Sequence, residues 1–240
     1  MRASRLSERE APAWRIQVDG EVTSALFEPA TPRAHAVYVF AHGAGGHMRD
    51  SRMEALAKVL RARGCDIVRF NFPYSERGSR RPDAMPLLKA CTLAVIERVR
   101  NELAPRILIV GGRSMGGRVA SMLAADGVAC DGLMLFAYPL HPAGKPEKLR
   151  DAHLREIDVP VLCFNGTRDS LCRRDLMENV LRGVHAPWRM HWLEGADHSF
   201  HVLKSSGRSY DDVLAEVGNA TCEWLSDTFN PANAKRSEDV

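Results

Sequence analysis

The sequence of 240 residues lacks several features that mark other classes of protein. No apolar run approaches the ~20 residues that a membrane-spanning helix needs, and no apolar segment of the signal-peptide type stands near the first methionine. No cluster of His and Cys side chains has the spacing of metal ligands, and no glycine-rich loop matches a phosphate-binding pattern. We therefore expect no metal, no organic cofactor and no association with a membrane.

Paired cysteines and a large excess of one charge are also missing. The six cysteines form no Cys-x-x-Cys pair, and several lie within apolar segments, as the buried, reduced thiols of intracellular proteins do. The 33 basic and 30 acidic side chains leave a formal charge of only +3, which is too small and too scattered for a nucleic-acid partner. The sequence thus predicts a soluble, cytoplasmic protein.

What the chain does contain is a regular alternation of apolar runs with amphipathic helical patterns. This alternation predicts an α/β fold, a mostly parallel twisted sheet with helices on both faces. Strands are expected at residues 14–18, 22–28, 36–41, 65–72, 107–111, 132–138, 159–164 and 188–193, and helices at 52–63, 85–103, 118–125, 174–184 and 211–229. The first two strands meet at Asp19-Gly20, a hairpin signal, so we expect them to be antiparallel.

The domain organisation follows from the same pattern. We expect one domain over residues 14–230, preceded by a flexible segment at 1–13 and followed by a polar tail at 231–240. Only residues 140–160 separate two core strands at the place where a lid could be inserted, and about twenty residues hold no more than a loop and a short helix. We therefore predict no separate lid domain, and an open pocket.

The most informative motif is Gly112-Arg113-Ser114-Met115-Gly116, a Gly-x-Ser-x-Gly element between an apolar strand and a helix. This context is typical of a nucleophile elbow, a sharp turn that presents a serine at the start of a helix. Glycines flank the serine because the turn leaves no room for neighbouring Cβ atoms. A helix N-terminus also favours developing negative charge, so Ser114 is the candidate nucleophile.

A serine hydroxyl needs a base to remove its proton, and the base needs an acid to orient it. Asp169 lies in the loop after the apolar run 161–164, and His198 lies in the loop after the last expected strand. Asp175 and Asp197 are weaker candidates for the acid, because the first lies farther along and the second adjoins the histidine. We predict that Ser114, Asp169 and His198 form a catalytic triad.

Acyl transfer also requires two donors for the transition-state oxyanion. The elbow supplies the backbone N–H of Met115. The loop 42–46, rich in small residues, supplies the second donor, with Ala44 as the first choice and Gly45 as the fallback.

Three further side chains on these loops are candidates for contact with substrate: His42, Arg113 and His141. For His42 we favour a structural role, in which a hydrogen bond from its ring supports the oxyanion loop, and contact with substrate is the alternative. Cys172 follows Asp169 closely, and we expect it to fill space rather than to react.

Taken together, residues 41–46, 111–117, 138–147, 166–169 and 195–198 resemble the α/β-hydrolase superfamily. They are most similar to its small lidless members, including dienelactone-hydrolase-like proteins and the testis-expressed/KANSL-type predicted hydrolases. The likeness runs from about residue 36 to 229, and it implies the α/β-hydrolase fold and a serine-hydrolase mechanism. Dienelactone hydrolases proper use a cysteine nucleophile where this chain has Ser114, so their substrate class is not implied.

The sequence therefore predicts a serine hydrolase that cleaves a carboxylic ester or thioester of a small molecule through an acyl-serine intermediate. The alternative is a non-catalytic hydrolase scaffold that serves as a protein-interaction module. A further hypothesis concerns charge. The loops 75–83, 141–150 and 168–175, expected at the catalytic edge, carry formal charges of +1, +2 and +1, which suggests a substrate with a carboxylate or phosphate.

Overall fold

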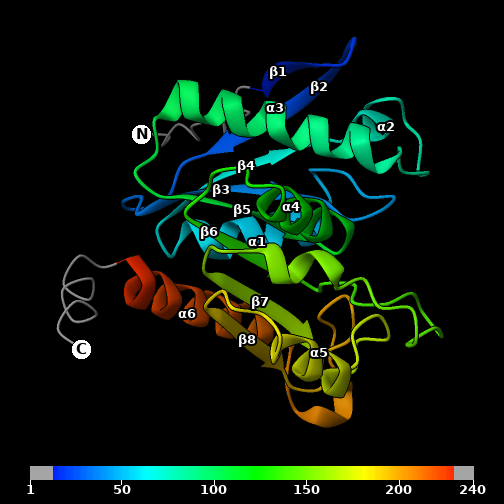
Figure 1. The fold of residues 1–240 in the computed structure, drawn as a ribbon. Helices are drawn as coiled ribbons and strands as arrows, with labels where there is room; N and C mark the ends of the chain where they lie inside the picture. The colour runs from blue at the N-terminus through cyan, green and yellow to red at the C-terminus, as the bar shows by residue number, and fades with distance from the viewer. Residues whose placement is uncertain (1–12, 230–240) are drawn as a thin grey trace, which may run out of the picture.

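The computed structural model describes residues 13–229 (Figure 1), so the segment expected to be flexible, apart from Ala13, and the expected polar tail lie outside the described residues. The strands are β1 (Ala13–Val18), β2 (Glu21–Glu28), β3 (Ala36–Ala41), β4 (Cys65–Phe70), β5 (Leu108–Arg113), β6 (Gly132–Phe136), β7 (Val161–Gly166) and β8 (Trp188–Leu193). The helices are α1 (Ser51–Arg61), α2 (Pro73–Glu76), α3 (Met85–Leu103), α4 (Met115–Ala125), α5 (Arg174–Leu181) and α6 (Tyr210–Phe229), with 3₁₀ turns η1 (Ala152–Glu156) and η2 (Lys204–Ser206).

The strands form one sheet in the order β1-β2-β4-β3-β5-β6-β7-β8. From β4 to β8 all neighbours are parallel, whereas β2 is antiparallel to both β1 and β4. The predicted hairpin is confirmed, and Asp19 and Gly20 turn it with φ of 46° and 82°. The predicted mostly parallel sheet is confirmed as well.

Helices cover both faces of the sheet (Figure 1). Apolar side chains of α3, α4 and α5, such as Val95, Val119 and Met177, pack into one core layer. Those of α1 and α6, such as Leu56 and Val217, pack into the other. Central strands are therefore buried on both sides, which explains why β3 reads as a continuous apolar run rather than an alternating one.

Two boundaries differ from the sequence prediction near the elbow. Helix α4 begins at Met115, three residues earlier than expected, because Gly116 and Gly117 belong to its first turn despite the low helix propensity of glycine. Strand β5 continues to Arg113, directly before Ser114. Between β6 and β7 the chain forms only loops and η1, so the described residues contain no separate lid, as predicted.

The fold buries His42 completely and His153 in part. The His42 ring has no exposed surface; its Nε2 accepts a hydrogen bond from the Phe72 N–H (3.1 Å), so the ring proton lies on Nδ1 and is donated to the Gly43 carbonyl (2.8 Å). Burial lowers the pKa of His42 to about 4, and that of the half-buried His153 also to about 4. Both rings are therefore neutral at physiological pH.

Gly166, the last residue of β7, lets two loops meet. A Cβ atom at this position would lie 2.1 Å from the Ala196 carbonyl oxygen and 2.5 Å from its carbon. The contact is reinforced by backbone hydrogen bonds from Thr167 N–H to Leu193 O (3.1 Å) and from Arg168 N–H to Ala196 O (2.9 Å). The loop after β7 is thereby held against the loop after β8.

We predict that Gly166→Ala destabilises the protein by about 3 kcal/mol or more, because the added methyl group meets backbone that cannot move independently. Urea unfolding measures the loss. Gly183→Ala is the matched control, since its Cβ would meet only the Arg155 side chain, at 3.5 Å or beyond. Equal unfolding midpoints for the two variants would contradict the close packing.

A second prediction concerns the stability of the protein at low pH. Because the pKa of His42 lies below its ordinary value of 6.5, the unfolded chain takes up the proton first. The contribution of His42 to stability is therefore complete above pH 6.5 and is lost as the pH falls toward 4, by about 3 kcal/mol in total. We expect the free energy of unfolding of His42→Gln to depend less on pH between 7 and 5 than that of the wild type. Parallel curves for the two proteins would rule this out.

Candidate active site

Ser114 stands in a strained turn between β5 and α4. Its backbone has φ 52° and ψ −115°, a conformation that residues other than glycine rarely adopt. The turn is held by the Ser114 N–H, which donates to Phe136 O (2.8 Å), and by the Ser114 carbonyl, which accepts from the Arg118 N–H (3.0 Å). A Cβ at Gly116 would lie 2.6 Å from the carbonyl oxygens of both Ala41 and His42, so only glycine lets α4 start against the end of β3.

The structure brings Ser114, His198 and Asp169 together from three loops. His198 Nε2 lies 3.0 Å from Ser114 Oγ, and His198 Nδ1 lies 2.8 Å from Asp169 Oδ2. A carboxylate only accepts hydrogen bonds, so Nδ1 carries the ring proton and Nε2 is free to accept from the serine hydroxyl. The Asp169 side chain is fully buried, whereas the His198 side chain keeps 24% of its surface exposed.

Asn165 is a residue of this site that the sequence analysis missed. Its buried amide donates to Asp169 Oδ2 and to Tyr138 O (3.1 Å each), and its oxygen accepts from the Tyr138 N–H (3.1 Å). The other Asp169 oxygen accepts from the Leu171 N–H (2.8 Å). Asn165 thus fixes the carboxylate against the end of β6. A polar residue directly after the apolar run of β7 was the available signal.

Two backbone N–H groups beside the serine have no hydrogen-bond partner within residues 13–229: those of Met115 and Ala44. The fallback Gly45 is engaged, because its N–H donates to the Tyr74 hydroxyl (3.2 Å). The loop lies against the elbow, since a Cβ at Gly43 would be 3.5 Å from Ser114 Cβ. Of the two alternatives for the second oxyanion donor, the geometry favours Ala44.

The three residues expected to contact substrate each make hydrogen bonds that hold loops of this site. His42 is buried with both ring nitrogens occupied, as described above. His141 is 2% exposed; its Nε2 accepts from the Arg173 N–H (3.1 Å), and its Nδ1 donates to Pro142 O (3.0 Å). Arg113 donates from Nη2 to the His198 carbonyl oxygen (2.6 Å), which ties the histidine loop to the elbow. All three brace loops, as the structural interpretation of His42 predicted.

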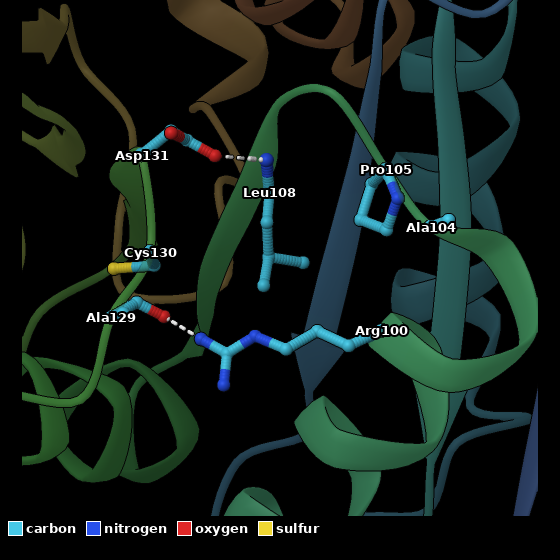
Figure 2. Close-up of a pocket in the computed structure, with 7 residues that line it drawn as sticks. All are labelled: Arg100, Ala104, Pro105, Leu108, Ala129, Cys130 and Asp131. Carbon is cyan, nitrogen blue, oxygen red and sulfur yellow. Dashed lines mark hydrogen bonds between the residues drawn. The ribbon is translucent and has the colours of Figure 1, made fainter.

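A cavity of about 450 Å³ lies at the opposite edge of the sheet, where β5 and β6 begin (Figure 2). Its polar groups are used to join strands: the Arg100 guanidinium donates to Ala129 O, and the Asp131 carboxylate accepts from the Leu108 N–H (2.7 Å). Burial raises the pKa of the Cys130 thiol to about 11, so it is protonated at neutral pH. We see no catalytic arrangement among the residues that line this cavity.

Burial likewise raises the pKa of the Cys172 thiol, next to the acid loop, and keeps it unreactive. Among residues 13–229, no group of three His, Cys, Asp or Glu side chains is placed to hold a metal ion. The helices in this part of the chain are all too short or too polar to cross a membrane.

Comparison with known proteins identifies the family. Among solved structures, the fold is similar to an alpha-beta serine hydrolase homologue from Coxiella burnetii (17% identity, TM-score 0.70, 92% of this chain and 99% of that one). It is also similar to a serine hydrolase without a lid from Xanthomonas campestris (20%, 0.69, 92% and 98%) and to a dienelactone hydrolase from Anabaena variabilis (17%, 0.68, 92% and 99%). A family model described as an alpha/beta hydrolase domain matches residues 34–226, so this chain belongs to the α/β-hydrolase family.

Proposed function

We propose that this protein is a serine hydrolase that cleaves a carboxylic ester or thioester through an acyl-serine intermediate. The observation that carries the proposal is the continuous relay from Ser114 Oγ to His198 (3.0 Å) and from His198 to the buried Asp169 (2.8 Å). Membership of the α/β-hydrolase family and the serine hydrolases among its structural neighbours support the same chemistry.

In the first half-reaction, Ser114 Oγ attacks the carbonyl carbon while His198 Nε2 takes the hydroxyl proton. The carbonyl oxygen becomes an oxyanion, which the Met115 and Ala44 N–H groups stabilise. Asp169 keeps the proton on Nδ1 and stabilises the imidazolium that forms. When the tetrahedral intermediate collapses, His198 protonates the departing alcohol or thiol, and the acyl group stays on Ser114.

In the second half-reaction, a water molecule attacks the acyl-serine and gives its proton to His198 Nε2. Collapse of this second intermediate returns the proton to Ser114 Oγ and releases the carboxylic acid. The His198 side chain is 24% exposed, so water can approach the imidazole that would activate it. Within residues 13–229 no lid is inserted between β6 and β7, which suits this step.

We predict that Ser114→Ala lowers kcat for a chromogenic acyl ester by about 10³-fold or more, because removal of the nucleophile leaves only the oxyanion donors. The melting temperature should change little, since the lost hydroxyl fills no core space. A fluorophosphonate probe should label the wild type at Ser114 and leave the variant unlabelled.

Ser199→Ala is the control, because Ser199 follows His198 but its hydroxyl makes no hydrogen bond within residues 13–229. It should keep wild-type kcat and labelling. A wild-type protein that the probe does not label, and that cleaves no ester or thioester in a panel of acyl chain lengths, would instead favour the non-catalytic scaffold.

A further inference from the structure

Several cations of the catalytic-edge loops are neutralised by their neighbours. Arg77 pairs with Glu21 and Asp83, and Arg174 pairs with Glu178 (2.7 Å). Arg173 pairs with Asp175 in the same way. The formal charge of these loops therefore overstates their attraction for an anion, which would bind more strongly to a cationic group that has no carboxylate partner.

Arg118 is such a group. It lies on α4, one helical turn after Ser114. Its Nε is buried and has no hydrogen-bond partner, one of two such side-chain atoms among the described residues. Its two terminal nitrogens are not buried, and they make no hydrogen bond within residues 13–229. None of the five N–H donors of this partly desolvated guanidinium, which α4 carries one turn after the candidate nucleophile, is thus bonded to another group within residues 13–229.

The surroundings of Arg118 make its unpaired, partly buried positive charge unfavourable. The first turns of α4 carry the positive end of the helix dipole, where a cation is destabilised. Burial and then the charge of Arg118 lower the pKa of Arg150, and the same two causes, in that order, lower the pKa of His153. Within residues 13–229, neither Arg118 nor Arg150 has a carboxylate within ion-pair distance.

A chain of hydrogen bonds fixes the backbone from which Arg118 and Arg150 project. Ser121 donates to Arg118 O (2.9 Å) and lies 2.8 Å from His153 Nε2, and the Tyr138 hydroxyl donates to Arg150 O (2.8 Å). The backbone of Tyr138 is bonded to Asn165, the residue that fixes the candidate acid. The backbone that carries Arg118 and Arg150 is therefore joined to the triad by one network of hydrogen bonds.

We propose that Arg118 and Arg150 form an anion subsite that binds a carboxylate or phosphate on the acyl part of the substrate. The inference rests on the proposed function and names its substrate class, esters whose acyl chain ends in a negative charge. One helical turn separates Arg118 from Ser114 by ~6 Å along the axis, and helical side chains lean toward the N-terminus. The charge should accordingly lie about three to five bonds from the scissile carbonyl.

The test compares two esters that differ only in charge: mono-p-nitrophenyl glutarate and its neutral methyl ester, each corrected for uncatalysed hydrolysis. We expect the wild type to prefer the anionic ester in kcat/KM by about 10- to 100-fold, the range for a hydrogen-bonded charge. Arg118→Gln should remove that preference while changing the neutral ester by no more than about twofold. Added salt should reduce the preference, as for any ion pairing near the surface.

Arg155→Gln is the matched control, because it removes the same charge from an exposed side chain in η1 that makes no ion pair within residues 13–229. It should keep the preference for the anionic ester. If the wild type cleaves both esters equally, or if Arg118→Gln and Arg155→Gln reduce the anionic rate alike, the subsite is refuted while the proposed function stands.

If the wild type cleaves neither ester and no probe labels Ser114, the proposed function fails. Binding of anionic probes then tests the anion subsite without catalysis. Calorimetry with Ser114→Ala, titrated with monomethyl glutarate or propyl phosphate, distinguishes carboxylate from phosphate recognition. Binding that Arg118→Gln abolishes in this background supports the subsite. Binding weaker than about 10 mM for both probes overturns it.

Discussion

The hydrogen bond between His198 Nδ1 and Asp169 Oδ2 is the interaction on which the candidate site depends. It joins the loop after β7 to the loop after β8, and it exists only because the glycine at the end of β7 lets their backbones touch. The carboxylate is fully buried, and such a charge is tolerated when hydrogen-bond donors surround it. Asn165 and the Leu171 N–H supply those donors, so the acid is fixed before any substrate arrives.

Close backbone packing also holds the elbow, on the serine side of the site. Ser114 has a positive φ, a backbone conformation that costs about 1–3 kcal/mol and persists only where the surroundings hold it. Here the turn is hydrogen-bonded to β6, and α4 begins in contact with the end of β3 through Gly116. The strained turn presents the hydroxyl to His198 and leaves the adjacent Met115 N–H without a partner within residues 13–229, an arrangement that suits a developing oxyanion.

His42, His141 and His198 lie in loops at this edge, and their roles differ although each ring carries its proton on Nδ1. In His42 and His141, Nδ1–H donates to a backbone carbonyl and Nε2 accepts from a backbone N–H, so both rings brace loops. In His198 the donor side meets a carboxylate, and Nε2 meets the serine hydroxyl. A histidine that follows a strand is therefore ambiguous until its two neighbours are known.

The sequence by itself determined the α/β class, the antiparallel hairpin, the absence of room for a lid and the three loops on which the candidate triad lies. These features depend on apolar periodicity, turn residues and segment lengths, which are local properties of the chain. Only the tertiary structure decided that Arg113 and His141 brace loops, that Asn165 holds the acid and that Arg118 has no counter-ion within residues 13–229. Those roles depend on contacts between residues far apart in the chain and on burial, and no local pattern encodes either.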